Sequence, residues 1–274
     1  MSILIIRRLL LSVALLSLAM FSFPAATRAA DEPKAREIME KVDARDDGDN
    51  GLSDMEMVLI DKQGSTRTRE IRSRMKDAGK DTHRIMFFIA PPDVKDTGFL
   101  TYDYDDSNRD DDQWLYLPAL RKTKRIASSD KSGSFMGSDF NYSDMTSRNL
   151  TDYDFSLVKE DEVDGHKVWL IQAMPRSRKV IDETGYTKSV VFVRQDNFVV
   201  VRAVNWVSES DRLKYFDVKK LELIDNIWVA TEVHMTTKQG KNSLHKTVLK
   251  YRNVRFNQKH DPDLFTVRRL EKGL

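Results

Sequence analysis

The sequence predicts a mainly β protein built on one large, curved antiparallel sheet. From Leu52 onward, apolar residues recur at every second position, which is the period of a β-strand. Turn signals rich in Asp, Asn and Gly interrupt this pattern roughly every 10 residues. The connections are too short for the crossovers that parallel strands need, so neighbouring strands are expected to be antiparallel.

Composition and charge exclude several classes of protein. Charged residues make up 32% of the chain and hydrophobic residues 40%, which is typical of a folded domain and not of a disordered or multispan membrane protein. Residues 1–29 hold three arginines and no acid, so 42 basic and 43 acidic residues remain. Without a basic surplus the protein is not expected to bind nucleic acid. The absence of Cys excludes disulfides, zinc-thiolate sites and thiol catalysis.

Residues 1–29 have the order of a secretory signal peptide. A pair of arginines precedes an apolar run over 9–23, and a stretch of small residues follows. The run is shorter than the roughly 20 residues that a membrane-spanning helix needs. Cleavage after Ala29 is preferred because it leaves the small Thr27 at the third position before the cut. We therefore expect export to the periplasm, with residues 30–274 forming a single domain.

One helix and about a dozen strands are predicted in the mature chain. The helix covers residues 33–47, where Ala35, Ile38, Met39 and Val42 have helical spacing. The stretch between the sixth and seventh strands is irregular, and we expect short helical pieces in the loops. The predicted strands are 52–60, 65–76, 82–90, 98–104, 113–117, 122–127, 153–160, 166–174, 186–194, 199–208, 213–223, 227–237 and 243–256.

Several of these strands are apolar on both faces. In residues 82–90, Phe87 and Ile89 alternate with Met86 and Phe88. A sheet with one face in water carries apolar residues on the other face only. One helix cannot cover a dozen strands, so either other segments of the chain or a hydrophobic ligand must cover the second face.

Motifs for metal binding and catalysis are weak. Residues 43–54 carry acids at several positions of a calcium loop, but Arg45 occupies a ligand position and Asp54 replaces the usual Glu, so a polar turn is preferred. Six aspartates crowd residues 103–112, where a divalent ion and ordinary turn chemistry are both open. Residues 133–137 do not form a nucleophile elbow because the Ser is one place early. We expect no catalytic residues, no metal and no cofactor.

The irregular stretch contains an apolar loop that follows a basic cluster. Such a loop either packs on the sheet or faces a partner, so it is either a fixed cover or a mobile lid. Its large side chains, the expected lid residues, are Phe135, Met136, Phe140 and Tyr142. The basic cluster is expected to contact anionic head groups, with a solvated strand face as the alternative. Its expected head-group residues are Arg121, Lys122 and Arg125.

Five segments carry a family resemblance. They are the helix at 33–47, FIAPPDV at 88–94, WLYLPA at 114–119, RIA at 125–127 and FMGSDF at 135–140. With them the chain resembles the periplasmic outer-membrane lipoprotein-sorting (LolA-like) family, and especially the branch whose members often accompany transporters of the resistance-nodulation-division (RND) type. The resemblance implies an incomplete antiparallel β-barrel, with helices covering a concave hydrophobic face that shelters acyl chains.

The function expected from this resemblance is that of a periplasmic carrier. Its partners would be lipid or lipoprotein acyl chains and an inner-membrane RND-type transporter, and the protein would be a monomer. The alternative is a non-carrier accessory module of an envelope transporter complex. Large strand residues supply the expected cavity wall, although a shift of one residue in register would exchange the two faces. These residues are Phe87, Ile89, Phe99, Trp114, Tyr116, Phe192, Val201 and Trp206.

Overall fold

Thirteen strands form one continuous antiparallel sheet in a computed structural model that describes residues 31–273. The strand order is β6-β5-β4-β3-β2-β1-β13-β12-β11-β10-β9-β8-β7. Within β1 to β6 and within β7 to β13, each strand therefore lies beside its neighbours in sequence. The pairing of β1 with β13 joins these two halves, and β6 and β7 form the two edges of the sheet. The predicted antiparallel sheet is confirmed. The predicted leader and its cleavage site lie outside the described residues.

The strands follow the alternating segments of the sequence closely. Most of their observed ends differ from the predicted ends by three residues or fewer, because turn-forming residues limit them. The strands are β1 (Leu52–Asp61), β2 (Thr66–Ala78), β3 (Asp81–Ala90), β4 (Gly98–Asp103), β5 (Asp112–Leu117), β6 (Lys122–Arg125), β7 (Tyr153–Val163), β8 (His166–Pro175), β9 (Tyr186–Arg194), β10 (Val200–Val207), β11 (Arg212–Ile224), β12 (Ile227–Gln239) and β13 (Asn242–Arg255).

Three short α-helices accompany the sheet. They are α1 (Pro33–Asp43), α2 (Arg178–Thr184) and α3 (Val267–Lys272). The prediction that the first helix extends to residue 47 is wrong, because a turn in which the Asp46 carboxylate accepts a hydrogen bond from the Gly48 backbone N–H follows the helix. In the described part of the chain, no helix combines the length and the apolar character needed to cross a bilayer.

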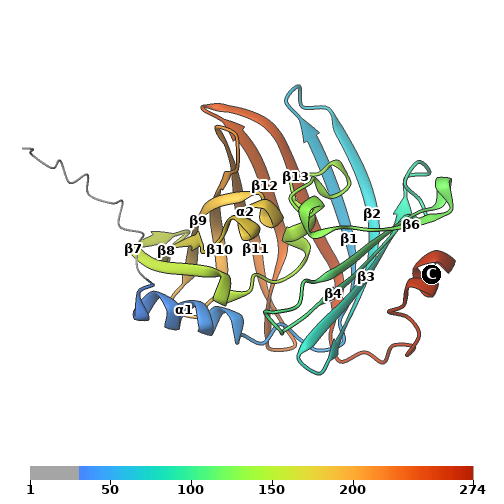
Figure 1. The fold of residues 1–274 in the computed structure, drawn as a ribbon, viewed down its shortest axis with the longest axis horizontal. Helices are drawn as coiled ribbons and strands as arrows, with labels where there is room; N and C mark the ends of the chain where they lie inside the picture. The colour runs from blue at the N-terminus through green and yellow to red at the C-terminus, as the bar shows by residue number, and fades with distance from the viewer. Residues whose placement is uncertain (1–30, 274) are drawn as a thin grey trace, which may run out of the picture.

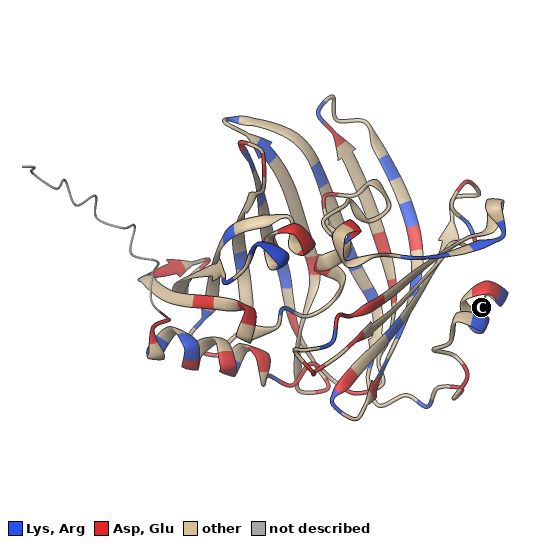
Figure 2. Ribbon diagram, in the orientation of Figure 1, with Lys and Arg blue, Asp and Glu red and all other residues tan. Residues whose placement is uncertain are grey.

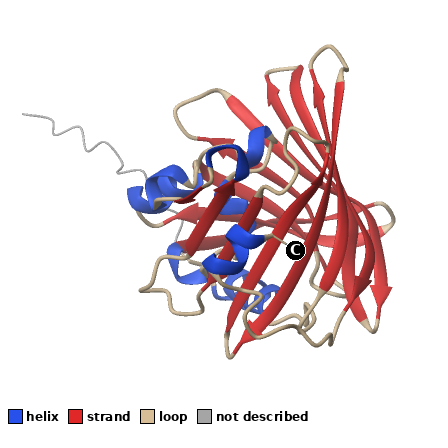
Figure 3. Ribbon diagram, turned by 90° about the vertical axis from the view of Figure 1, so that its right-hand side faces the viewer, coloured by secondary structure: helices blue, strands red, loops and turns tan. Residues whose placement is uncertain are grey.

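The sheet curls so that it has an inner and an outer face. A segment of short 3₁₀ turns over residues 126–152, here called the cap segment, crosses in front of the inner face together with α2 (Figure 1). The C-terminal residues 257–273, here called the C-terminal segment, lie on the outer side of β3 to β6, as the turned view shows (Figure 3). Lys and Arg are spread along many strands and mixed with Asp and Glu (Figure 2).

The core is divided between the two faces. The inner face carries the largest cluster of buried side chains, which includes Phe88, Phe99 and the cap residue Phe135. Helix α1 extends the inner core over β7 to β10 through Ile38 and Met39. The outer face of β3 to β5 is packed against the C-terminal segment. Segments of the chain thus cover both faces of β3 to β5, which is one of the two alternatives that the apolar alternation left open.

Candidate functional site

Two adjoining cavities lie between the inner face of the sheet and the cap segment. Their volumes are about 430 Å³ and about 390 Å³. Phe140 from the cap and Phe216 from β11 line both cavities, so the two spaces meet at these rings. Each volume lies in the range of pockets that hold small organic ligands, roughly 300 to 1,000 Å³. These cavities are the candidate functional site.

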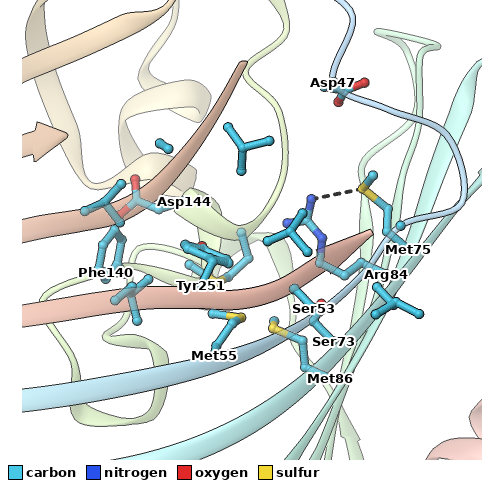
Figure 4. Close-up of a pocket in the computed structure, with 18 of the residues that line it drawn as sticks. Asp47, Ser53, Met55, Ser73, Met75, Arg84, Met86, Phe140, Asp144 and Tyr251 are labelled. Atoms are coloured by element: carbon cyan, nitrogen blue, oxygen red, sulfur yellow. Dashed lines mark hydrogen bonds between the residues drawn. The ribbon is translucent and has the colours of Figure 1, made fainter. Parts of the chain in front are cut away.

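Methionine is the most frequent residue type in the walls of the cavities. Seven of the 11 methionines in the chain line one cavity or the other, and Figure 4 shows several of them facing the first. A thioether side chain is flexible and polarizable, so a wall of methionines adapts to apolar ligands of different shape. The seven residues are Met39, Met55, Met57, Met75, Met86, Met145 and Met235.

The cap segment is tied to the sheet by a buried carboxylate. Asp139, only 3% exposed, accepts hydrogen bonds from the hydroxyls of Thr237 and Thr247 on β12 and β13. Its backbone N–H donates to Thr247 Oγ1 at 2.9 Å. A buried carboxylate is costly unless it is fully hydrogen-bonded, so this arrangement fixes the cap at one place on the sheet.

Two buried lysines hold the cap from other sides. Lys131, whose side chain is 1% exposed, places Nζ 2.6 Å from Glu183 Oε1 of α2. Lys214 Nζ of β11 lies 2.6 Å from Asn141 Oδ1, and burial lowers the pKa of this lysine while Asp144 and Asp139 raise it. The sequence analysis missed these anchors because their partners are distant in the chain.

The four predicted lid residues all lie over the inner face. Phe135 is 1% exposed, and its ring centroid is 5.0 Å from that of Phe99 and 5.6 Å from that of Tyr142. Phe140 lines both cavities, and Met136 packs on the same inner cluster. The structure therefore brings the four together beside the cavity. Whether they act as a lid stays a prediction.

Four of the predicted wall residues lie on the opposite face from the cavities. Phe87, Ile89, Trp114 and Tyr116 pack in the outer cluster against the C-terminal segment. The register in β3 gives the reason: Met86 and Phe88 face inward, so their odd-numbered neighbours face outward. The prediction that these four residues line the cavity is therefore wrong, because the inward-facing residues of these strands are one position away in the sequence.

The other four predicted wall residues also lie outside both cavity linings. Phe192 and Val201 belong to a separate cluster with Val168 and Leu170. The half-buried Trp206 has Lys188 Nζ 3.8 Å from its ring centroid. Phe99 does face inward but is covered by Phe135. The sequence analysis chose these residues as cavity-wall candidates because their side chains are large. Side-chain size does not distinguish the two faces of a sheet when both faces are buried.

The predicted head-group residues are at the edge of the sheet and not at the cavities. Arg121, Lys122 and Arg125 are exposed on and beside β6, and none lines either cavity. Arg125 forms an ion pair with Asp112 of β5. A ligand inside the cavities would therefore not meet these three side chains.

Charged residues that the sequence analysis did not select lie at the cavities instead. Arg84 lines the first cavity, and Arg45 and Asp47 line both (Figure 4). Asp47 is reached by solvent but enclosed by protein atoms, and this burial raises its pKa, an effect that Arg84 and Arg45 partly offset. Charged residues in a loop, such as Arg45 and Asp47, or within a strand, such as Arg84, are typical of solvated positions. The sequence therefore gave little indication that these three line a cavity.

The aspartate-rich loops meet near the end of α1. Asp43, Asp103, Asp105 and Asp111 line a polar hollow there, and burial together with Asp103 raises the pKa of Asp111 to about 6. Within residues 31–273, no group of three or more His, Cys, Asp or Glu has the geometry to hold a metal ion.

The fold and the cavities define an open barrel with a largely apolar interior beneath a cap. A protein-family model described as "Uncharacterized protein" matches residues 80–272. An outer membrane lipoprotein-sorting protein domain from Vibrio parahaemolyticus is 31% identical, with a TM-score of 0.78 over 87% of this chain and 98% of that one. The chain therefore belongs to the outer-membrane lipoprotein-sorting family.

Two other solved structures have the same architecture. A DUF1329 family protein from Desulfovibrio piger is 28% identical, with a TM-score of 0.79 over 88% of this chain and 99% of that one. A LolA superfamily protein from Nitrosomonas europaea has a TM-score of 0.64 at 17% identity over 85% of this chain and 98% of that one, which is a likeness of fold. A search of curated proteins finds no match.

Proposed function

We propose that this protein is a carrier that binds an acyl chain of a lipid or lipoprotein in the two adjoining cavities. The observation that supports the proposal best is the methionine-rich wall that the cap segment covers without filling. Each CH₂ group of a chain costs about 0.8 kcal/mol to expose to water, so a carrier must offer a comparable apolar surface. Membership of a family that includes a lipoprotein-sorting domain agrees with this role.

The carrier is proposed to work in the periplasm. The leader 1–29, removed after Ala29, would direct export, and the mature monomer would move its cargo between membranes or to and from an RND-type transporter. Phe135, Met136, Phe140 and Tyr142 would act as the lid that admits and releases the chain. N-terminal sequencing of protein from the periplasmic fraction, with Ala30 as the expected first residue, checks the first step.

Lipid analysis of the protein from its native compartment tests the proposal. Native mass spectrometry of periplasmic protein should show a bound mass in the lipid range, and the delipidated protein should bind the neutral fluorescent probe N-phenyl-1-naphthylamine. Lipid extracted from the sample should displace the probe. Protein without bound lipid and without affinity for the probe would contradict the carrier role and favour the alternative, a non-carrier accessory module of an envelope complex.

A further inference from the structure

The guanidinium of Arg84 points into the first cavity without a strong partner. It comes from the inner face of β3, where its neighbours Met86 and Phe88 are apolar. Within the described residues 31–273, its one hydrogen bond runs from Nη2 to Met75 Sδ at 3.4 Å (Figure 4). A guanidinium has five N–H donors, and a thioether sulfur is a weak acceptor. Arg84 therefore has several donors available to whatever occupies the cavity.

Arg45 is a second cation in the same space. It lines both cavities, and Nη1 donates to the backbone oxygens of Asp46 and Trp228 at 3.2 and 3.0 Å. Among the residues of known placement, neither Arg45 nor Arg84 has a carboxylate oxygen within 4.0 Å. Other arginines of the sheet do have such partners, for example Arg72 with Asp54 at 3.5 Å.

Asp47 is the carboxylate that shares the cavities with these arginines. It extends from the loop between α1 and β1 and lies on the same side of the first cavity as Arg84 (Figure 4). The second acid in the lining, Asp144, already accepts hydrogen bonds from the Asn141 N–H and the Tyr186 hydroxyl. Within residues 31–273, neither of these two carboxylates lies within 4.0 Å of either guanidinium, so both arginines keep N–H donors for a bound anion.

We propose that Arg84 and Arg45 bind the anionic head group, a carboxylate or a phosphate, of an amphiphile whose chain lies in the apolar cavities. The inference rests on the proposed carrier function and adds the chemical class of the cargo. Arginine suits this role because its planar N–H fork matches the oxygens of both anions in a bidentate way. The bound anion would supply the charged partner that the two arginines lack. Such pairing matters here because a charge among apolar wall residues is costly unless it is paired.

Three ligands with the same 14-carbon chain test this inference on the mature protein. Myristate carries a carboxylate, 1-myristoyl lysophosphatidate carries a phosphate, and 1-myristoylglycerol is the neutral counterpart of the second. Each is titrated below its micelle concentration against bound N-phenyl-1-naphthylamine. At least one anionic ligand should bind about tenfold or more tightly than the neutral ester, since a charge-assisted hydrogen bond is being gained.

Substitutions then assign this preference to the arginines. Arg84→Met should weaken the preferred anionic ligand by about tenfold or more while leaving 1-myristoylglycerol within about twofold. Arg84→Lys keeps the charge without the fork and should lose less. The control is Arg74→Met, because Arg74 is a half-buried arginine on the neighbouring strand β2 that is absent from both cavity linings. Asp47→Asn should tighten the anionic ligand because it removes a competing negative charge.

The outcomes separate the two proposals. Equal affinity for all three ligands, or an equal loss for all three in Arg84→Met, would overturn the head-group site and leave the carrier role standing. A loss confined to lysophosphatidate or to myristate would support the site and identify phosphate or carboxylate as the head group. Failure of the probe and of every ligand to bind would overturn both. If Arg84→Met does not fold, Arg45→Met is judged by the same criteria.

Discussion

The two faces of strands β3 to β5 have similar apolar alternation but are covered in different ways. On the outer face, Leu264, Phe265 and Leu270 of the C-terminal segment pack directly on the sheet. On the inner face, the cap segment covers β4 through Phe135, while the first cavity reaches β3 through Arg84 and Met86 and the second lies farther along the sheet, over β7 to β12. Alternating apolar residues therefore identify strands with two buried faces, whereas the covering segment decides which face can hold a ligand.

Close contacts explain why the outer face is filled. Leu270 lies so near β4 that a Cβ at Gly98 would be 2.6 Å from its Cδ1, so any larger residue there would force the Leu270 side chain to shift. The Tyr102 hydroxyl donates to the Phe265 backbone oxygen at 2.7 Å. The inner face instead presents flexible methionines such as Met55 and Met86 to open space. The rigid packing of the outer face suits a structural scaffold, and the adaptable wall of the inner face suits a binding surface.

The largest expected effect is a loss of stability caused by a substitution on the outer face that leaves the cavities unchanged. Phe87 and Met86 are adjacent in β3 and face opposite sides. Phe87→Ala should lower the free energy of unfolding by about 3 to 5 kcal/mol, because it empties a closely packed site. It should not change the affinity of the folded protein for N-phenyl-1-naphthylamine.

Met86→Ala is the matched variant and should change that affinity. Denaturant unfolding and probe titration on both proteins measure the two effects, and a loss of probe affinity confined to Phe87→Ala would reverse the assignment of the faces.

A second prediction concerns the anchor of the cap over the inner face. Asp139→Asn keeps the size of the side chain but removes a charge that two threonine hydroxyls hydrogen-bond. The free energy of unfolding should fall by about 1.5 to 3 kcal/mol, the range for hydrogen bonds to charged groups. If the cap is a lid, the weaker anchor should also speed both uptake and release of the probe in stopped-flow measurements. Unchanged exchange rates with lowered stability would make the cap a fixed cover.

The comparison of faces also explains what the sequence could and could not predict. The strands were predictable because Asp, Asn and Gly turns limit segments of clear alternation. The inner position of Phe135 and Phe140 agrees with one of the two alternatives for the apolar loop, that it packs on the sheet. The outer position of Phe87 and Trp114 was not predictable, because it depends on where residues 257–273 dock, and that contact is distant in sequence. Arg84 was missed for a related reason: its role appears only when the strands enclose a cavity.

A third prediction concerns a substitution that fills part of the second cavity and leaves the outer face unchanged. Ala203 of β10 is 7% exposed and lines the second cavity. Ala203→Leu should reduce the affinity for the probe and raise the free energy of unfolding by about 0.5 to 2 kcal/mol, because the added methyl groups enter empty space. Ala173, on β8 and in the same lining, offers an independent position for the same change. A loss of about 1 to 3 kcal/mol would instead indicate overpacking, and the space would then be too small for a ligand.

The last prediction concerns a pH-dependent effect of the charge at the end of β2, beyond the packed parts of both faces. Burial and the neighbouring Asp49 raise the pKa of Asp77 to about 7, against roughly 3.9 in an unfolded chain. Between these values the folded protein binds more protons than the unfolded one, so this group makes the protein less stable as the pH rises from about 4 to about 7. Asp77→Asn mimics the protonated acid, so its melting temperature should exceed that of the wild type at pH 8, with a smaller gain at pH 5.

Asp263→Asn, a change at an exposed aspartate of the C-terminal segment, should show the same difference from wild type at both pH values. An Asp77→Asn gain that does not grow with pH would mean that the two carboxylates are separated in solution.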